Sequence, residues 1–216
     1  SGEVWLVGAG PGDVKLLTIF AVYALSKADV IIYDALVSEE ILKFAKDDAL
    51  LIYAGKRGGK PSHNQTDISK LIIQYAKDGH RVLRLKGGDP YIFARGAEES
   101  FILNENNISY RVIPGITSSI GGMASASIPA TSRNTNSSIL FLTGHNTNGE
   151  VPDDINWEAV AKIPVVVMYM AIKHLPIIAQ RLIKEGRPSD DRIAVIQDAT
   201  LKSERVLESN LMKINI

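Results

Sequence analysis

Four short segments combine glycine with charged or hydroxyl side chains, and these are the residues best suited to do chemistry. They are Gly8–Asp13, Gly55–Lys60, Gly87–Pro90 and Pro114–Ser119. Glycine lets a ligand approach the backbone closely, and a neighbouring charged side chain can then hold a polar group of that ligand. Each segment directly follows a short apolar run, so we expect all of them to occupy equivalent places in the fold.

The first segment, G-A-G-P-G-D, has some features of a dinucleotide-binding turn, including an acid, Asp34, about twenty residues further on. The spacing does not fit, because the third glycine of G-x-G-x-x-G would have to stand where Asp13 stands. Pro11 also removes a backbone N–H that a pyrophosphate would need. The pattern alone leaves two interpretations open, a tight structural turn and a ligand-binding loop.

The second segment, G-K-R-G-G-K, is not a phosphate-binding P-loop. That motif requires glycine where Ala54 stands and serine or threonine where Pro61 stands. What remains is a glycine-rich basic loop, which is either a solvated surface loop or part of a site at the end of a strand.

The third segment, G-G-D-P, favours a ligand site over a plain turn. Asp89 can accept hydrogen bonds from an amine or hydroxyl group of a ligand, and an Arg95–Glu98 pair follows closely. Arg95 begins a helical pattern, where a cation opposes the helix dipole, and Glu98 can hold its guanidinium as an i, i+3 partner. The fourth segment begins a helix, where N–H groups either bind an anion or are capped by Thr117 or Ser118.

Apolar runs alternate with helical patterns through the first half of the chain, which predicts an α/β fold with a mostly parallel sheet covered on both faces. Loops after the strands of such a sheet converge on its carboxyl edge. The predicted strands are 4–7, 30–33, 50–53, 82–85 and 111–113.

A second α/β series follows Pro114-Gly115 and a polar loop that contains Arg133. We therefore predict two α/β domains, 1–114 and 115–216. The strands predicted for the second domain are 139–142, 165–168, 193–196 and 205–207, with a helix over about 173–185.

Composition narrows the functional classes. Basic and acidic residues number 24 each, so global charge gives no support for nucleic-acid binding. No apolar run reaches the roughly 18 residues that a membrane span needs, and no signal segment opens the chain. The absence of cysteine excludes disulfides and thiolate sites and fits the cytoplasm, and the four histidines include no i, i+4 pair.

Taken in order, the motifs closely resemble the tetrapyrrole methylase family, the class III S-adenosylmethionine-dependent methyltransferases. The resemblance covers about residues 3–208. G-A-G-P-G-D and L-K-G-G-D-P are specific for the broad family, and G-K-R with R-G-A-E-E is typical of members that methylate uroporphyrinogen III. The matching segments are V-G-A-G-P-G-D at 7–13, Y-D-A-L-V-S at 33–38, G-K-R at 55–57, R-L-K-G-G-D-P at 84–90, R-G-A-E-E at 95–99, V-I-P-G-I-T-S at 112–118 and Y-M at 169–170.

The resemblance implies a homodimer of two-domain chains with the active site in the interdomain cleft. It implies that two methyl groups pass from S-adenosylmethionine to uroporphyrinogen III, giving precorrin-2 and S-adenosylhomocysteine without a metal. Asp34 matches the proposed base and Lys56 the proposed proton donor. The residues implied to line the cofactor site are Pro11, Gly87, Gly88, Asp89, Ile92, Thr117, Ser118, Met170 and Ala199.

The substrate carries many carboxylates, and arginine suits them because its guanidinium can form two parallel hydrogen bonds. Arg57, Arg84, Arg95 and Arg133 lie in or beside the motif segments, and Glu98 accompanies them as a proposed substrate-site residue. Methyl transfer from a sulfonium needs mainly alignment, followed by a base that removes a proton.

The chain departs from the family pattern by a few small substitutions, including Ala171 and Ala199, which stand where glycine is usual. The family usually has a further apolar strand, so we expect an incomplete C-terminus. The alternatives are a methylase of a later corrin intermediate, a nucleotide- or dinucleotide-binding module, and a relative that methylates ribosomal RNA or diphthine. Neutral charge and the matches at Lys56, Arg95, Glu98 and Arg133 disfavour the last alternative.

Overall fold

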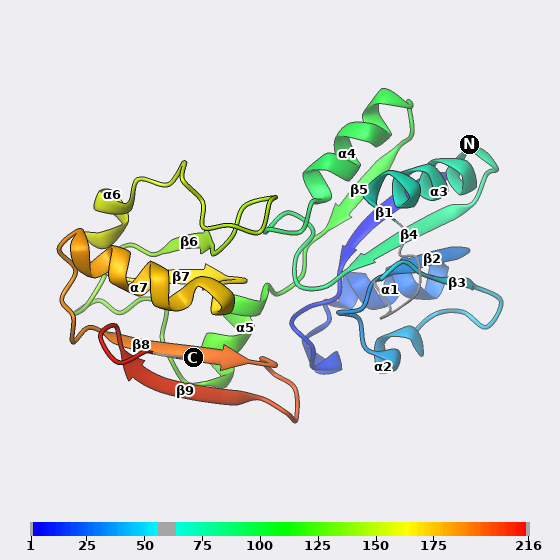
Figure 1. Ribbon diagram of the computed structural model, residues 1–216. Coiled ribbons are helices and arrows are strands. Elements are labelled where there is room, and N and C mark those ends of the chain that lie inside the picture. Colours follow the sequence, from blue (N-terminus) through cyan, green and yellow to red (C-terminus); the bar gives the residue numbers. More distant parts are fainter. Residues whose placement is uncertain (1, 56–63, 215–216) are drawn as a thin grey trace. The chain divides into compact units, whose positions relative to one another are not determined.

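The computed structural model describes residues 2–55 and 64–214 and contains two compact units, Ser1–Gly121 and Gly122–Ile216 (Figure 1). The boundary between them lies inside helix α5 (Ser118–Ser125). The division into domains 1–114 and 115–216 stays a prediction. None of the helices in these described ranges combines the length and apolar character that a bilayer crossing requires.

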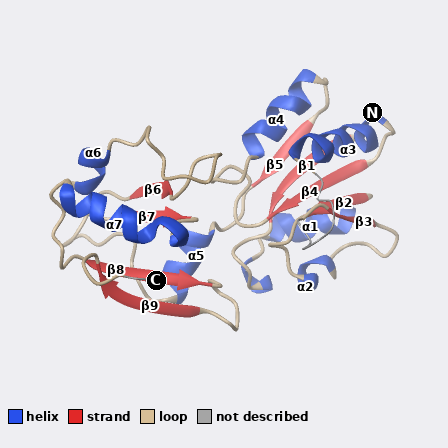
Figure 2. Cartoon of the chain, viewed as in Figure 1, coloured by secondary structure: helices blue, strands red, loops and turns tan. Residues whose placement is uncertain are grey.

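The first unit is built on a five-stranded sheet in which every pairing is parallel, with the strand order β3-β2-β4-β1-β5. The predicted α/β class and the predicted strands are confirmed. The strands are β1 (Glu3–Gly8), β2 (Val30–Tyr33), β3 (Leu50–Tyr53), β4 (Arg81–Lys86) and β5 (Tyr110–Ile113) (Figure 2).

Helices cover both faces of this sheet (Figure 1). Because successive side chains of a strand point to opposite faces, Trp5 and Val7 of β1 pack on one side and Val4 and Leu6 on the other. The first side is covered by α1 (Ile19–Lys27) and α2 (Glu39–Leu42), and the second by α3 (Gln65–Lys77) and α4 (Gly96–Glu105).

Polar residues set the ends of these helices. Thr18 caps α1 by accepting a hydrogen bond from the N–H of Ala21 at 3.0 Å. The apolar residues at helical spacing from Leu16 onward therefore belong to two helical segments instead of one. The first of these is a separate 3-10 turn over Val14–Leu16. Gly79, with φ of +94°, ends the segment after α3, as the sequence predicts.

The second unit contains two separate strand pairs. β6 (Leu140–Thr143) and β7 (Val166–Tyr169) are parallel, whereas β8 (Arg192–Gln197) and β9 (Arg205–Asn210) form an antiparallel hairpin. The helical segments of this unit are α6 (Trp157–Ala161), the 3-10 turn η2 (Ile172–His174) and α7 (Leu175–Lys184).

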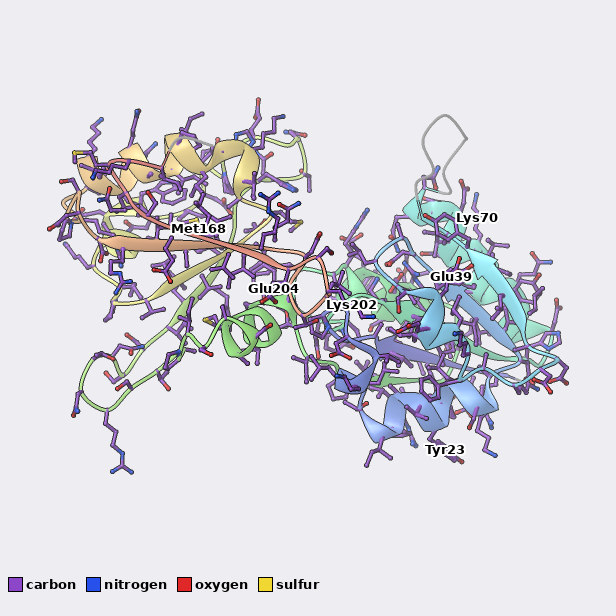
Figure 3. The ribbon with its side chains drawn as sticks, turned by 90° about the horizontal axis from the view of Figure 1, so that it is seen from below. Tyr23, Glu39, Lys70, Met168, Lys202 and Glu204 are labelled. Carbon is purple, nitrogen blue, oxygen red and sulfur yellow. The ribbon has the colours of Figure 1, made fainter. Side chains whose placement is uncertain are left out.

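The hairpin is tied to α5 through its turn. Ser125 Oγ on α5 donates a 2.8 Å hydrogen bond to Glu204 Oε1, and Figure 3 shows Glu204 beside this helix. Gly122 lies against Ala199, because a Cβ added at this glycine would be 3.1 Å from the alanine methyl group. The turn that contains Ala199 is therefore packed on α5.

Candidate active site

The loops after β1 and β4 are joined by backbone hydrogen bonds. Gly10 N–H donates to Gly88 O at 3.1 Å, and Gly88 N–H donates to Gly10 O at 2.7 Å. Both glycines have positive φ, +75° and +64°, a conformation that side chains with a Cβ rarely adopt. Two of the glycine-rich segments therefore form one structure at the carboxyl edge of the sheet.

The loop after β5 joins the same structure. A Cβ at Gly115 would collide with Gly88 O and lie 2.9 Å from the Cα of Gly8, so three glycine backbones are in close contact. Asp89 fixes this contact, because its Oδ2 accepts a hydrogen bond from Gly115 N–H at 3.1 Å. The predicted convergence of the loops after β1, β4 and β5 on one edge is confirmed.

Asp89 also orders its own loop. Its second oxygen, Oδ1, accepts a 2.8 Å hydrogen bond from Tyr91 N–H. Thr117 lies beside Gly88, since a Cβ there would be 3.5 Å from the threonine Cα. Both carboxylate oxygens of Asp89 thus hold the backbone of the loops together, and its contact with a cofactor stays a prediction.

Asp34 lies directly after β2, at the same edge of the sheet, and is half-buried. Its Oδ1 accepts a 3.1 Å hydrogen bond from Leu36 N–H, and its Oδ2 lies 3.8 Å from Arg84 Nη2. Asp34 does not cap α2, because this helix begins later and its N-cap residue is Ser38. Asp34 instead closes a short turn and faces a cation.

Arg84, which the sequence assigned to the substrate, lies inside the first unit. It is 3% exposed, and its Nε donates a 3.0 Å hydrogen bond to Glu99, which is 1% exposed. Its Nη1 lies 3.3 Å from two backbone oxygens, those of Ile32 and Leu85. These contacts turn the guanidinium toward the protein interior, with Nη2 facing Asp34.

Arg95 and Glu98 are paired on the surface of α4. Arg95 Nη2 donates to Glu98 Oε2 at 2.8 Å, and Arg95 Nε lies 3.2 Å from both carboxylate oxygens. This hydrogen bonding raises the pKa of Arg95 and lowers the pKa of Glu98. Arg95 is the N-cap residue of α4 with a left-handed φ of +60°, so the backbone itself is constrained at this position. The predicted i, i+3 pair is present.

The remaining predicted residues are distributed over both units. In the first, Pro11 is half-buried, whereas Ile92 and Ser118 are exposed. In the second, Met170 follows β7 with a positive φ of +54°, Arg133 is exposed in its loop, and Ala199 is half-buried. Ala199 is not among the residues with positive φ, so alanine fits the backbone where the family usually has glycine. Lys56 and Arg57 lie outside the described residues.

Three residues around Arg84 were not predicted from the sequence. Glu99 binds Arg84, and Gln65 and Lys86 both contact Glu99. One signal could have found Lys86 and Glu99. Arg84 and Lys86 alternate on a strand of otherwise apolar residues, so they share one buried face, and two buried cations require a buried acid.

Across 2–55 and 64–214, no group of histidine and acidic side chains could hold a metal ion.

The comparison with known families agrees with this geometry. The model of the tetrapyrrole (corrin/porphyrin) methylases matches residues 3–215 of the chain. The chain belongs to this methylase family.

Named relatives within the methylase family are close in sequence. A uroporphyrinogen-III C-methyltransferase from Sinorhizobium is 53% identical over 213 residues, which are 98% of this chain and 76% of that protein. The siroheme synthase of Methylobacillus flagellatus is 45% identical over 97% of this chain. The chain spans only 45% of that longer protein.

Solved structures of methylases share the fold. Uroporphyrin-III C-methyltransferase from Thermus thermophilus, in complex with S-adenosylhomocysteine, is 32% identical, covers 100% of this chain and 93% of its own, and has a TM-score of 0.85. Cobalt precorrin-4 methyltransferase has the same TM-score at 22% identity, which shows the common fold alone.

Proposed function

We propose that the chain is an S-adenosylmethionine-dependent C-methyltransferase that adds two methyl groups to uroporphyrinogen III, giving precorrin-2. The observation that carries this proposal is the junction of three glycine-bearing loops at one sheet edge, in a chain that is 53% identical to a relative named for this activity. A tetrapyrrole substrate also fits the arginine–glutamate pair on α4.

The glycine junction suits an adenosyl ligand because it brings three loops together at the carboxyl edge of the sheet, where ligands of parallel sheets bind. Gly87 and Gly88 present no Cβ, and Thr117 lies beside the second of them. We assign cofactor binding in the first unit to these residues together with Pro11, Asp89, Ile92 and Ser118. In the second unit, we assign it to Met170 and Ala199. When bound, S-adenosylmethionine supplies an electrophilic methyl group: the new C–C bond forms as the S–C bond breaks, and sulfur keeps the electron pair.

Asp34 is proposed to accept the proton that the macrocycle loses after methylation. Its Oδ1 is held by Leu36 N–H, whereas its Oδ2 lies beyond hydrogen-bond distance from Arg84, at 3.8 Å. Oδ2 is therefore the atom on which we place the proton. Lys56 stays the proposed proton donor.

The substrate carboxylates are assigned to Arg57, Arg95 and Arg133, with Glu98 orienting the second of these. The bidentate contact from Glu98 restrains the guanidinium of Arg95 at the surface, where 59% of its side chain is exposed. A restrained guanidinium binds a carboxylate with less loss of side-chain entropy. A homodimer, a cytoplasmic location and the absence of a nucleic-acid partner stay predictions.

Two measurements test the cofactor and the substrate separately. Calorimetry with S-adenosylhomocysteine should give the same affinity before and after treatment with a chelator, and affinity that returns only with added metal would contradict the proposal. Competition between uroporphyrinogen III and a later corrin intermediate should show preference for the former. The reverse preference would favour the alternative methylase.

A further inference from the structure

A carboxylate is buried behind the proposed site. Glu99 on α4 is 1% exposed, and its Oε1 accepts hydrogen bonds from Arg84 Nε at 3.0 Å and Gln65 Nε2 at 3.1 Å. Its Oε2 forms an ion pair with Lys86 Nζ at 3.0 Å, without the alignment of a good hydrogen bond. Removing a carboxylate from water is unfavourable unless it gains such partners, so this side chain requires both cations.

The two cations of the cluster are buried as deeply as the acid. Arg84 and Lys86 are 3% and 4% exposed, and both point from β4 toward the layer of α3 and α4. Burial lowers the pKa of Lys86, and the attraction of Glu99 opposes this effect. Stability alone does not account for such a charge cluster, because apolar residues of similar volume in the same place often give a protein that is equally stable or more stable.

The guanidinium of Arg84 connects this acid with the proposed base. Nε is bound to Glu99, Nη1 faces backbone oxygens, and Nη2 lies 3.8 Å from Asp34 Oδ2. Because a guanidinium is planar and rigid, the bond at Nε fixes where Nη2 lies. The position of Glu99 therefore determines where the positive charge of Arg84 lies relative to Asp34.

Glu99 also links α4 with α3. It follows Glu98 on the helix that Arg95 begins, and its partner Gln65 is the first residue of α3. On α4 the two adjacent acids thus have opposite surroundings: Glu98 holds Arg95 at the surface and Glu99 holds Arg84 inside.

We propose that Glu99 is a positioning residue for methyl transfer, which holds Arg84 so that its guanidinium faces Asp34. This inference rests on the proposed function, because Asp34 is the base only in that reaction. The competing explanation is that the cluster of Arg84, Lys86 and Glu99 contributes to folding alone.

The test replaces Glu99 with glutamine, which keeps the shape of the side chain and removes its charge. Turnover of uroporphyrinogen III and S-adenosylhomocysteine affinity are measured on the same samples, with turnover expressed per cofactor-binding site. We expect kcat to fall by at least about tenfold, within the roughly 100-fold loss that a misplacement of about 1 Å can cause, while cofactor affinity stays within about threefold. Glu105→Gln, the same change at an exposed position at the end of α4, is the matched control and should retain wild-type kcat.

A second variant covers the case in which Glu99→Gln does not fold. Combining it with Lys86→Met removes one cation with the acid, so that Arg84 and Asp34 remain as a balanced pair. This variant should fold and still lose turnover by at least about tenfold, because the neutral amide oxygen of glutamine holds Arg84 Nε more weakly than a carboxylate does.

Kcat within about threefold of wild type in the variants that fold, or an equal loss of cofactor affinity and turnover, would overturn the inference. Failure of the proposed function is distinguishable, since the wild-type enzyme would then not methylate uroporphyrinogen III.

Discussion

Gly10 and Gly88 exchange two backbone hydrogen bonds, at 3.1 and 2.7 Å, between loops that follow different strands of one sheet. Gly8 and Gly115 pack against the same place, backbone to backbone. The three loops, to which we assign cofactor binding, therefore depend on one another, and a change in one should disturb the others.

Gly115→Ala should test this dependence. Its Cβ would collide with Gly88 O and crowd Gly8, and neither backbone atom can rotate away. We expect the free energy of unfolding to fall by about 1–3 kcal/mol, as for overpacking, with loss of S-adenosylhomocysteine binding. Urea denaturation and calorimetry measure both effects.

Gly87→Ala is the matched control for stability. The nearest contact of its Cβ is Cβ of Leu36, at 2.8 Å, and this contact can be relieved by a shift of the turn that carries Leu36, a residue that is 76% exposed. It should cost less stability than Gly115→Ala. An equal cost in both variants would show that the backbone junction is not what matters.

Arg95→Ala should weaken use of the tetrapyrrole roughly 10- to 100-fold and leave S-adenosylhomocysteine affinity near wild type. The expected size follows from a charge-assisted hydrogen bond of about 1.5–3 kcal/mol. Arg95→Lys should rescue activity only partly, because an ammonium group cannot form two parallel hydrogen bonds to a carboxylate. Steady-state kinetics beside a cofactor titration measure both quantities.

The left-handed backbone at Arg95 supplies a control. Asparagine tolerates positive φ better than alanine, so Arg95→Asn should lose the same substrate affinity while melting closer to wild type. If substrate use is retained in both neutral variants, the Arg95–Glu98 contact is a surface ion pair worth about 0–1 kcal/mol and nothing more.

Asp34→Asn should lower kcat while cofactor affinity and melting temperature stay nearly unchanged. Asparagine can still accept the hydrogen bond from Leu36 N–H, so the turn is kept, but its amide cannot take up a proton. Unchanged turnover with a lower melting temperature would mean that the residue serves the turn alone.

A separate prediction concerns pH and Asp29, at the opposite end of the sheet. Hydrogen bonds from Lys46 Nζ at 2.7 Å and from Arg81 N–H at 2.8 Å lower the pKa of Asp29 below its ordinary value of 3.8. A carboxyl with a lowered pKa stabilises the fold above its unfolded pKa, and this contribution is lost as pH falls through the folded pKa.

Asp29→Asn should therefore reduce the free energy of unfolding by about 0.5–1 kcal/mol at pH 7, a modest amount because the ion pair is partly exposed. The difference from wild type should persist down to about pH 5 and shrink below pH 3.8. Urea denaturation across this range measures it, and a difference that grows on acidification would contradict the assignment.

The sequence predicts the strands of the first unit well because buried parallel strands are short apolar runs, such as Val30–Tyr33, bounded by glycine or charge. Their loops can be placed at one edge because parallel strands end together. The antiparallel hairpin of β8 and β9 was not foreseen, since the pairing direction of two apolar strands depends on partners that the pattern does not reveal.

The contacts of Arg84 could not be predicted from residue types alone. Its place in R-L-K-G-G-D-P indicated a substrate contact, and only the packing of α4 on β4 shows Glu99 at its Nε. Conversely, Arg95 and Glu98 could be paired from spacing alone, because residues three apart on a helix are neighbours whatever the rest of the fold does.

The most direct measurement incubates the protein with S-adenosylmethionine and uroporphyrinogen III without oxygen and determines the product by mass spectrometry. Our account predicts a tetrapyrrole that has gained two methyl groups, with two molecules of S-adenosylhomocysteine released for each. A protein that binds S-adenosylhomocysteine but leaves uroporphyrinogen III unmethylated would contradict it.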